Sequence, residues 1–85
     1  LKIRVLTEMS DQFIQPAIAL LAEVLECPTS ALSKDDTIET VKKWDSLNHM
    51  RLILLIEDRL NTRIDPDAAL DLFTIKEIAN YLSKK

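Results

Sequence analysis

The sequence has no glycine, one cysteine (Cys27) and one histidine (His49) among its 85 residues. A single cysteine excludes a disulfide within the chain, and one cysteine with one histidine cannot supply the four ligands of a structural zinc site. The carboxylates of Asp65, Asp67 and Asp71 lack the spacing and the glycine of an EF-hand calcium loop. The sequence therefore predicts no metal site, and the absence of disulfides fits a reducing, cytoplasmic setting.

Positive charge and long apolar runs are also scarce. Eleven Lys and Arg are outnumbered by fourteen Asp and Glu, which gives a formal net charge of -3. A mildly acidic chain lacks the basic surface that nucleic-acid binding requires, and no apolar run approaches the ~20 residues of a membrane-spanning helix. Hydrophobic residues make up 47% of the chain and charged residues 29%, which is a globular composition. We therefore expect neither a nucleic acid nor a membrane as a partner.

The length fits one domain over residues 1–85, with residues 1–9 as an N-terminal extension. Hydrophobic periodicity predicts an all-α fold, a four-helix bundle. Only residues 2–6 have the pattern of a short irregular strand. Because the helical pattern continues close to Lys84 and Lys85, the domain is expected to be free-standing.

The first helix is predicted within residues 10–26. Pro16 lacks a backbone donor, so the helix either begins near Ile14, which places the proline in the first turn, or is kinked. Cys27 and Pro28 follow the helix, and the cysteine is interpreted as a small buried hydrophobe rather than a reactive thiol.

A long connection, residues 29–45, separates the first helix from the second, and loops of this length are often functional. Leu32 and Ile38 are expected to pack against the core and hold the loop down. Trp44 near its end has two interpretations. It covers the loop against the bundle, or it contacts a binding partner.

Three further helices complete the expected bundle. The second covers residues 46–60 and is followed by Asn61, which tolerates the left-handed conformation common after a helix. A short third helix is predicted over residues 66–70, and Thr74 is the expected N-cap of the last. Apolar residues share one face of that last helix: Ile75, Ile78, Ala79 and Leu82.

Apolar residues occupy more than one face of the second predicted helix. At about 100° per residue, one stripe is expected to face the core and comprises His49, Ile53, Ile56 and Leu60, with Leu52 beside it. The opposite stripe comprises Leu47, Arg51, Leu54 and Asp58. Leucines between charged residues on the expected solvent face indicate a docking surface. The alternative is a central helix that is buried on two sides.

Ser46 lies where this second helix begins. Serine is a common N-cap, so the expected role of its hydroxyl is to accept a backbone N–H. Asp45 is the alternative cap and would leave the serine free. The N–H groups and the positive dipole at this helix end would also stabilise an anion such as a phosphodiester on Ser46. His49 lies one turn further, but no motif supplies the third group that would orient it as a base, so a histidine bonded to a backbone carbonyl is expected.

The segment Asp45-Ser46-Leu47, opening an apolar helix that ends in Glu57-Asp58-Arg59-Leu60, resembles the attachment motif of acyl carrier proteins and peptidyl carrier domains. The similarity covers nearly the whole chain. It includes Ala22-Glu23-Val24-Leu25, Leu32-Ser33-Lys34-Asp35-Asp36, Ile64-Asp65-Pro66-Asp67 and Phe73-Thr74-Ile75.

The resemblance implies a covalent 4′-phosphopantetheine arm on Ser46, installed from coenzyme A by a phosphopantetheinyl transferase. The arm would hold an acyl or aminoacyl group as a thioester. The domain itself would have no catalytic residue and would act as a monomer that visits loading and acyl-transferring enzymes. Asp45 and Leu47 would flank the attachment site. The residues expected to face partners are Leu47, Arg51, Leu54, Glu57 and Asp58.

Two departures narrow this expectation. Fatty-acid carriers have a strongly acidic second helix, whereas acidic and basic residues balance over residues 47–60 here. Charge complementarity selects partners, so a specialised pathway is expected rather than primary fatty-acid synthesis. Lys42 and Lys43 replace a glycine-containing approach to the motif. They are a solvated pair, or they help to recognise a phosphate of coenzyme A or an acidic partner. The competing function is an unmodified helical adaptor that binds proteins through Leu47 and Leu54.

Overall fold

The computed structural model describes residues 12–84. Its helices are α2 (Ile14–Leu25), α3 (Ser46–Leu60), α4 (Pro66–Ala69) and α5 (Ile75–Ser83), with one turn of 3-10 helix, η1, at Thr29–Ala31. No strand forms among the described residues, and a single isolated bridge pairs Thr37 with Thr74. The predicted all-α class is confirmed, including the long loop before the second helix and the short third helix. The proposed extension and the strand pattern at its start lie outside the described residues.

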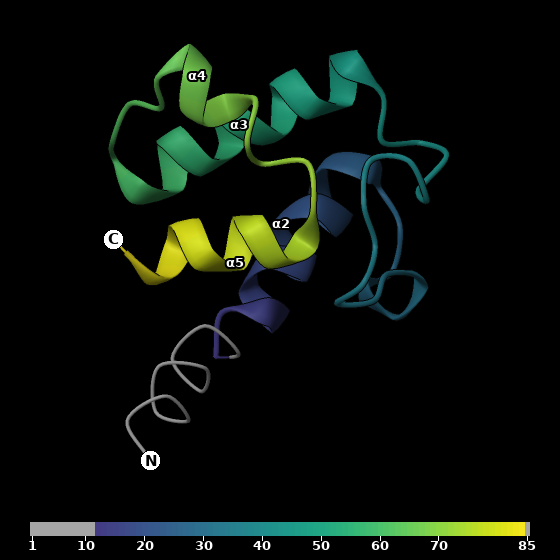
Figure 1. Ribbon diagram of the computed structural model, residues 1–85. Coiled ribbons are helices and arrows are strands. Elements are labelled where there is room, and N and C mark those ends of the chain that lie inside the picture. The colour runs from purple at the N-terminus through teal and green to yellow at the C-terminus, as the bar shows by residue number, and fades with distance from the viewer. Residues whose placement is uncertain (1–11, 85) are drawn as a thin grey trace.

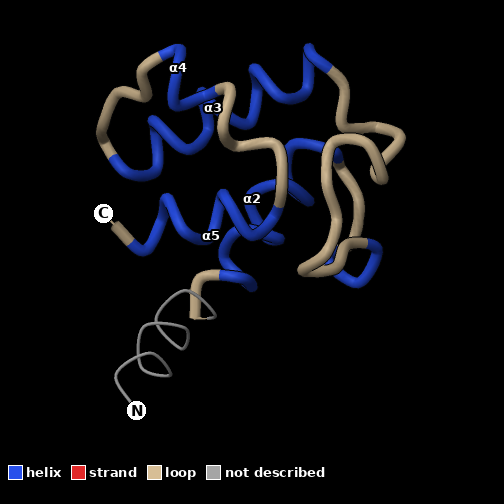
Figure 2. The backbone as a smooth tube through the Cα atoms, in the orientation of Figure 1, coloured by secondary structure: helices blue, strands red, loops and turns tan. Residues whose placement is uncertain are grey.

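The helices form two levels in Figure 1, with α3 and α4 above α5, and α2 behind α5. Helix α2 packs against both α3 and α5. The tube in Figure 2 shows how much of the chain between α2 and α3 is loop. This loop leads directly into the start of α3 at Ser46.

Helix α2 begins at Ile14, which confirms one of the two interpretations of Pro16. The proline is the third helical residue, so the hydrogen bond that it cannot donate is one that the helix does not form. The Ala17 N–H closes the first turn on the Phe13 carbonyl at 2.9 Å. The helix ends at Glu26, whose φ of 55° is left-handed, a conformation that costs a residue with a Cβ about 1–2 kcal/mol.

One core is shared by all the longer helices. Trp44 is its largest side chain and is 1% exposed, so the interpretation in which it covers the loop against the bundle is confirmed. Leu32 is buried and Ile38 packs partly buried against the same core, as expected. Cys27 is half-buried beside them. The buried residues on α5 are those predicted to share its face, namely Ile75, Ile78, Ala79 and Leu82.

The long loop is fastened to the start of α5. The Ile38 N–H donates to the Phe73 carbonyl at 2.8 Å, and the Ile75 N–H donates to the Asp36 carbonyl at 3.1 Å. Thr74 caps α5 as predicted, because its hydroxyl oxygen accepts the Glu77 N–H at 2.9 Å. The loop is therefore a defined part of the fold.

None of the helices within residues 12–84 is long and apolar enough to cross a membrane. Over the same residues, no cluster of three or more His, Cys, Asp or Glu side chains is arranged to hold a metal ion.

Candidate attachment site at the start of helix α3

Asp45, and not Ser46, caps helix α3. An Asp45 carboxylate oxygen accepts the Asn48 N–H at 2.9 Å, and the Asp45 carbonyl accepts the His49 N–H at 2.8 Å. Ser46 is therefore the first helical residue, so the expectation that the serine caps the helix was wrong and the alternative with Asp45 as the cap is confirmed. The physical reason is the extended backbone of Asp45, which turns its side chain back over the first turn.

Because Asp45 is the cap, the hydroxyl of Ser46 is free. Ser46 is exposed, and within residues 12–84 its Oγ makes no hydrogen bond. It lies at the positive end of a helix of 15 residues, where N–H groups of the first turn have no partner inside the helix. A negative group attached there would be stabilised by about 0.3–1 kcal/mol. The hydroxyl is thus accessible at a point that favours an anionic product.

The residues just before Ser46 are bonded to a side chain of α3. The Asn48 amide donates to the Lys43 carbonyl at 2.8 Å, which fixes the last residues of the loop against the first turn. The side chains of Lys42 and Lys43 are exposed, as their solvated interpretation requires. Both positive charges therefore lie within four residues of the serine along the chain.

A cavity of about 440 Å³ opens beside Ser46 between α3 and α4. Apart from Ser46 and His49, its lining side chains are apolar: Ile38, Met50, Ile53, Ile64, Pro66, Ala69, Leu70 and Phe73. This volume lies within the range of about 300–1,000 Å³ that is usual for small-molecule sites. An apolar groove with a free hydroxyl in its lining suits a flexible group that is anchored at Ser46.

His49 lies at the inner side of the groove and is 8% exposed. Its Nε2 lies 2.9 Å from the Ala69 carbonyl oxygen, and the Trp44 indole N–H donates to its Nδ1 at 3.0 Å. The expectation of a histidine bonded to a backbone carbonyl is confirmed. Because both ring nitrogens are engaged, His49 is not free to take a proton from Ser46.

The outer face of α3 is a surface and not a second buried side. Leu47 is 60% exposed and Leu54 is 59% exposed, so the alternative of a helix buried on two sides was wrong. Met50 and Leu70 are each 63% exposed and extend the apolar surface to the rim of the groove. Sequence reasoning missed these two residues. The helical wheel offered a signal for Met50, since it falls between Leu54 and the core stripe, but none for Leu70 in its short turn.

The charged residues of α3 divide into two kinds. Arg51 and Asp58 are exposed and make no ion pair with other described residues. Glu57 is half-buried, and its carboxylate accepts the Ile64 N–H at 2.7 Å. Arg59 donates to both carboxylate oxygens of Glu23 at 2.8 Å. Of the three charged residues expected to face partners, Glu57 is thus engaged within the protein.

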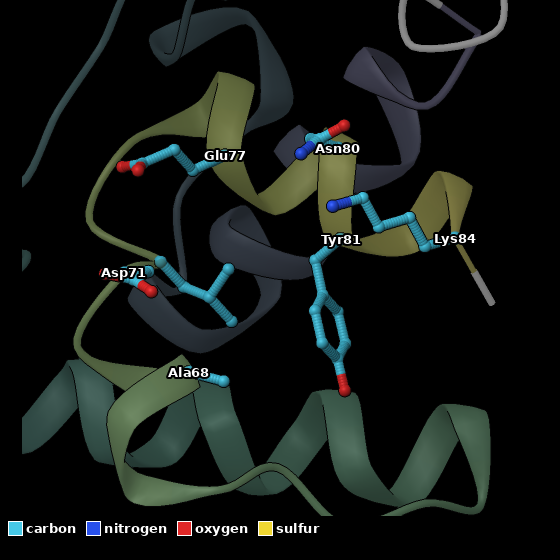
Figure 3. A pocket seen from close by; sticks show the side chains of 7 residues that line it. Ala68, Asp71, Glu77, Asn80, Tyr81 and Lys84 are labelled. Atoms are coloured by element: carbon cyan, nitrogen blue, oxygen red, sulfur yellow. The ribbon is translucent and has the colours of Figure 1, made fainter.

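A second cavity, of about 330 Å³, lies between α4 and α5. Figure 3 shows Asp71, Glu77, Asn80 and Lys84 around it, with the Tyr81 ring directed toward α3. These four polar side chains are exposed and carry mixed charge. The cavity includes neither Ser46 nor any other residue of α3, so it is separate from the groove beside Ser46.

A small helical bundle with a free serine at the start of a long helix has the architecture of a carrier domain. The model of the protein family described as "Phosphopantetheine attachment site" matches residues 15–82. The chain therefore belongs to this family, and the resemblance to acyl and peptidyl carrier proteins is confirmed. The cofactor of the family is covalently attached 4′-phosphopantetheine. A comparison with curated proteins finds no match.

Proposed function

We propose that Ser46 carries the 4′-phosphopantetheine arm and that residues 1–85 act as one monomeric carrier domain. The observation that carries the proposal is the exposed Ser46 hydroxyl, which is free because Asp45 caps α3. When attached, the arm supplies a terminal thiol that holds an acyl or aminoacyl group as a thioester. The protein would shuttle this cargo between the enzymes that load it and those that transfer it.

The residues around Ser46 suit a phosphodiester at that position. Asp45 caps the first turn by accepting the Asn48 N–H, and the positive dipole at this helix end would stabilise a phosphate attached to Ser46. Lys42 and Lys43 add positive charge close by. His49 takes no part as a base, so the transfer of the arm requires a separate enzyme.

Partner enzymes are proposed to dock on the exposed ridge of α3 that contains Leu47 and Leu54. Both leucines expose more than half of their surface and flank Arg51. Apolar side chains close to the attachment point would be covered when a partner reaches the serine, and their burial would favour the complex. Met50 and Leu70 would join this contact at the rim of the groove.

The charges of α3 support partners from a specialised pathway. After Glu57 and Arg59 are engaged within the protein, Arg51 is the free charge of this helix nearest to Ser46, and Asp58 lies two turns further on. The exposed face of α3 nearest to the serine is therefore apolar, and its free charge is the positive charge of Arg51. A partner of complementary charge would present carboxylates, unlike partners that bind the acidic helix of fatty-acid carriers.

Intact-mass spectrometry tests the attachment. The protein is incubated with coenzyme A and a broad-specificity phosphopantetheinyl transferase, and the wild type is expected to gain the mass of one arm. Ser46→Ala should remain at the unmodified mass. Ser30→Ala is the matched control, because Ser30 is exposed but lies in η1, and it should be modified like the wild type.

Peptide mapping of the modified protein should place the added mass on Ser46. A wild type that stays unmodified with active transferase, while still binding other proteins through Leu47 and Leu54, would favour the unmodified adaptor. Modification of Ser46→Ala would refute Ser46 as the attachment residue.

A further inference from the structure

A chain of hydrogen bonds through His49 joins the segment before Ser46 to helix α4. The Trp44 indole N–H donates to His49 Nδ1 at 3.0 Å, and His49 Nε2 lies 2.9 Å from the Ala69 carbonyl oxygen. An indole nitrogen can only donate and a carbonyl can only accept. Nδ1 must therefore be the acceptor and Nε2 must carry the proton. The two partners together select one tautomer of the neutral ring.

The bond between Trp44 and His49 is buried, and the bond between His49 and Ala69 is part-buried. Trp44 is 1% exposed and His49 is 8% exposed. The rings of His49 and Phe73 lie 4.5 Å apart between centroids, with an angle of 48° between their planes. Buried donors and acceptors are costly to leave without partners, so loss of the Trp44–His49 bond would be costly.

Each of the two hydrogen bonds of His49 holds a segment that has little stability of its own. Trp44 is two residues before Ser46, and its indole is the largest group that anchors the end of the long loop. Ala69 ends α4, a helix of four residues, which is too short to persist alone. The other end of this segment is held by the bond between Glu57 and the Ile64 N–H. Two side chains of α3 thus fix the wall of the groove.

We propose that His49 is a positioning residue for the attachment of the arm. Its bond to Trp44 holds the residues just before Ser46 in one arrangement for the transfer, while its bond to Ala69 selects the tautomer that accepts from Trp44 and holds the wall of the groove. The inference rests on the proposed role of Ser46. In the transfer, Ser46 Oγ attacks the pantetheine-linked phosphorus of coenzyme A, the bond to the other phosphate breaks, adenosine 3′,5′-bisphosphate leaves, and the serine proton passes to the transferase or to solvent. His49 acts on none of these atoms directly.

Conservative variants separate the two hydrogen bonds. In His49→Asn the side-chain oxygen takes the place of Nδ1 and can still accept from Trp44. In His49→Gln the amide nitrogen takes the place of Nε2 and can still donate to Ala69. His49→Phe keeps an aromatic ring and neither bond, and Trp44→Phe removes only the indole donor.

In steady-state kinetics of arm transfer to the apo protein, kcat should depend on the hydrogen bond between Trp44 and His49, which is the one nearest to Ser46. We expect kcat to fall about fivefold to tenfold in His49→Gln, Trp44→Phe and His49→Phe, which is the range for loss of a buried hydrogen bond. His49→Asn should retain a kcat close to that of the wild type. KM should change little, because the exposed ridge of Leu47 and Leu54 is unchanged. Circular dichroism at the assay temperature selects the variants that are folded.

Nitrogen-15 NMR of the apo protein supplies a readout that does not depend on the arm. The His49 ring should show the Nε2–H tautomer, and the Trp44 indole resonance should move in His49→Gln but much less in His49→Asn. An Nδ1–H tautomer would overturn the inference. So would wild-type kcat in folded His49→Gln and Trp44→Phe, or equal losses of rate and stability in His49→Asn and His49→Gln, which would indicate a structural role alone.

The two proposals fail in different ways. A wild type that never gains the arm would remove the function and, with it, the positioning role. Normal loading of the wild type with unchanged kcat in the variants would remove only the role of His49.

Discussion

Because Asp45 and not Ser46 caps α3, substitutions of the two residues should differ in their effect on the free energy of unfolding. Asp45→Ala removes the carboxylate oxygen that accepts the Asn48 N–H at 2.9 Å, and loss of an N-cap costs about 1 kcal/mol, within a range of about 0.5–2 kcal/mol. Ser46→Ala removes a hydroxyl that bonds to nothing among the described residues. Alanine also suits the interior of a helix. The free energy of unfolding should therefore change by less than about 0.5 kcal/mol in Ser46→Ala.

Thermal and urea denaturation followed by circular dichroism at the helix band compare the two variants. For a domain of this size, 1 kcal/mol corresponds to a Tm shift of about 4–8 °C. Asp45→Ala should show a shift of that order, and Ser46→Ala should melt close to the wild type. Asp45→Asn is the matched control, because asparagine caps helices about as well as aspartate, so it should recover most of the lost stability.

The opposite ranking would refute the reasoning. If Ser46→Ala lost 1 kcal/mol or more and Asp45→Ala lost nothing, the serine would be the cap. Its hydroxyl would then be engaged with the helix backbone, and the observation that supports the attachment site would be lost.

Three further substitutions test other contacts of α3. Glu57→Ala should destabilise the protein by about 1–2 kcal/mol in urea denaturation, because removal of the half-buried carboxylate leaves the Ile64 N–H without its acceptor. Glu57→Gln keeps a side-chain oxygen and should lose less stability. Arg59→Ala should change stability by no more than about 0.5 kcal/mol, since its ion pair with Glu23 is half exposed; a larger loss would mean that the pair is better shielded than its exposure indicates. Leu54→Glu should leave the Tm unchanged, because the leucine is 59% exposed, but should raise the KM for arm transfer about tenfold, and an unchanged KM would place docking elsewhere.

Local patterns in the chain predicted most of the helices. Pro16 indicated either a start of α2 near Ile14 or a kink, and the first of these is what forms. Thr74 caps α5 as expected, and Asn61 adopts the left-handed conformation, with φ 51°, that ends α3. These features depend on residues close together in the sequence, so the sequence contains the information needed to predict them. The motif around Ser46 was equally visible, because the family pattern is continuous along the chain.

Such local patterns could not predict which residue caps α3. Asp45 and Ser46 are both good N-caps, and which of them accepts the Asn48 N–H depends on the backbone angles at the end of a long loop. Trp44, directly before Asp45, is buried in the core, so the end of this loop is held by packing against residues that are distant in the sequence. The residues next to Asp45 in the sequence therefore do not show which of the two residues is the cap.

The amino-acid sequence by itself determined the all-α class, the order of the helices and the serine at the start of α3, because helical periodicity and caps are local properties. Only the tertiary structure decided that this serine is free and that Glu57 is bonded to Ile64. It also decided that His49, which bonds to Trp44, bonds to Ala69, 20 residues further along the chain. Such contacts are selected by the packing of the whole core, which brings together groups that are distant in the sequence.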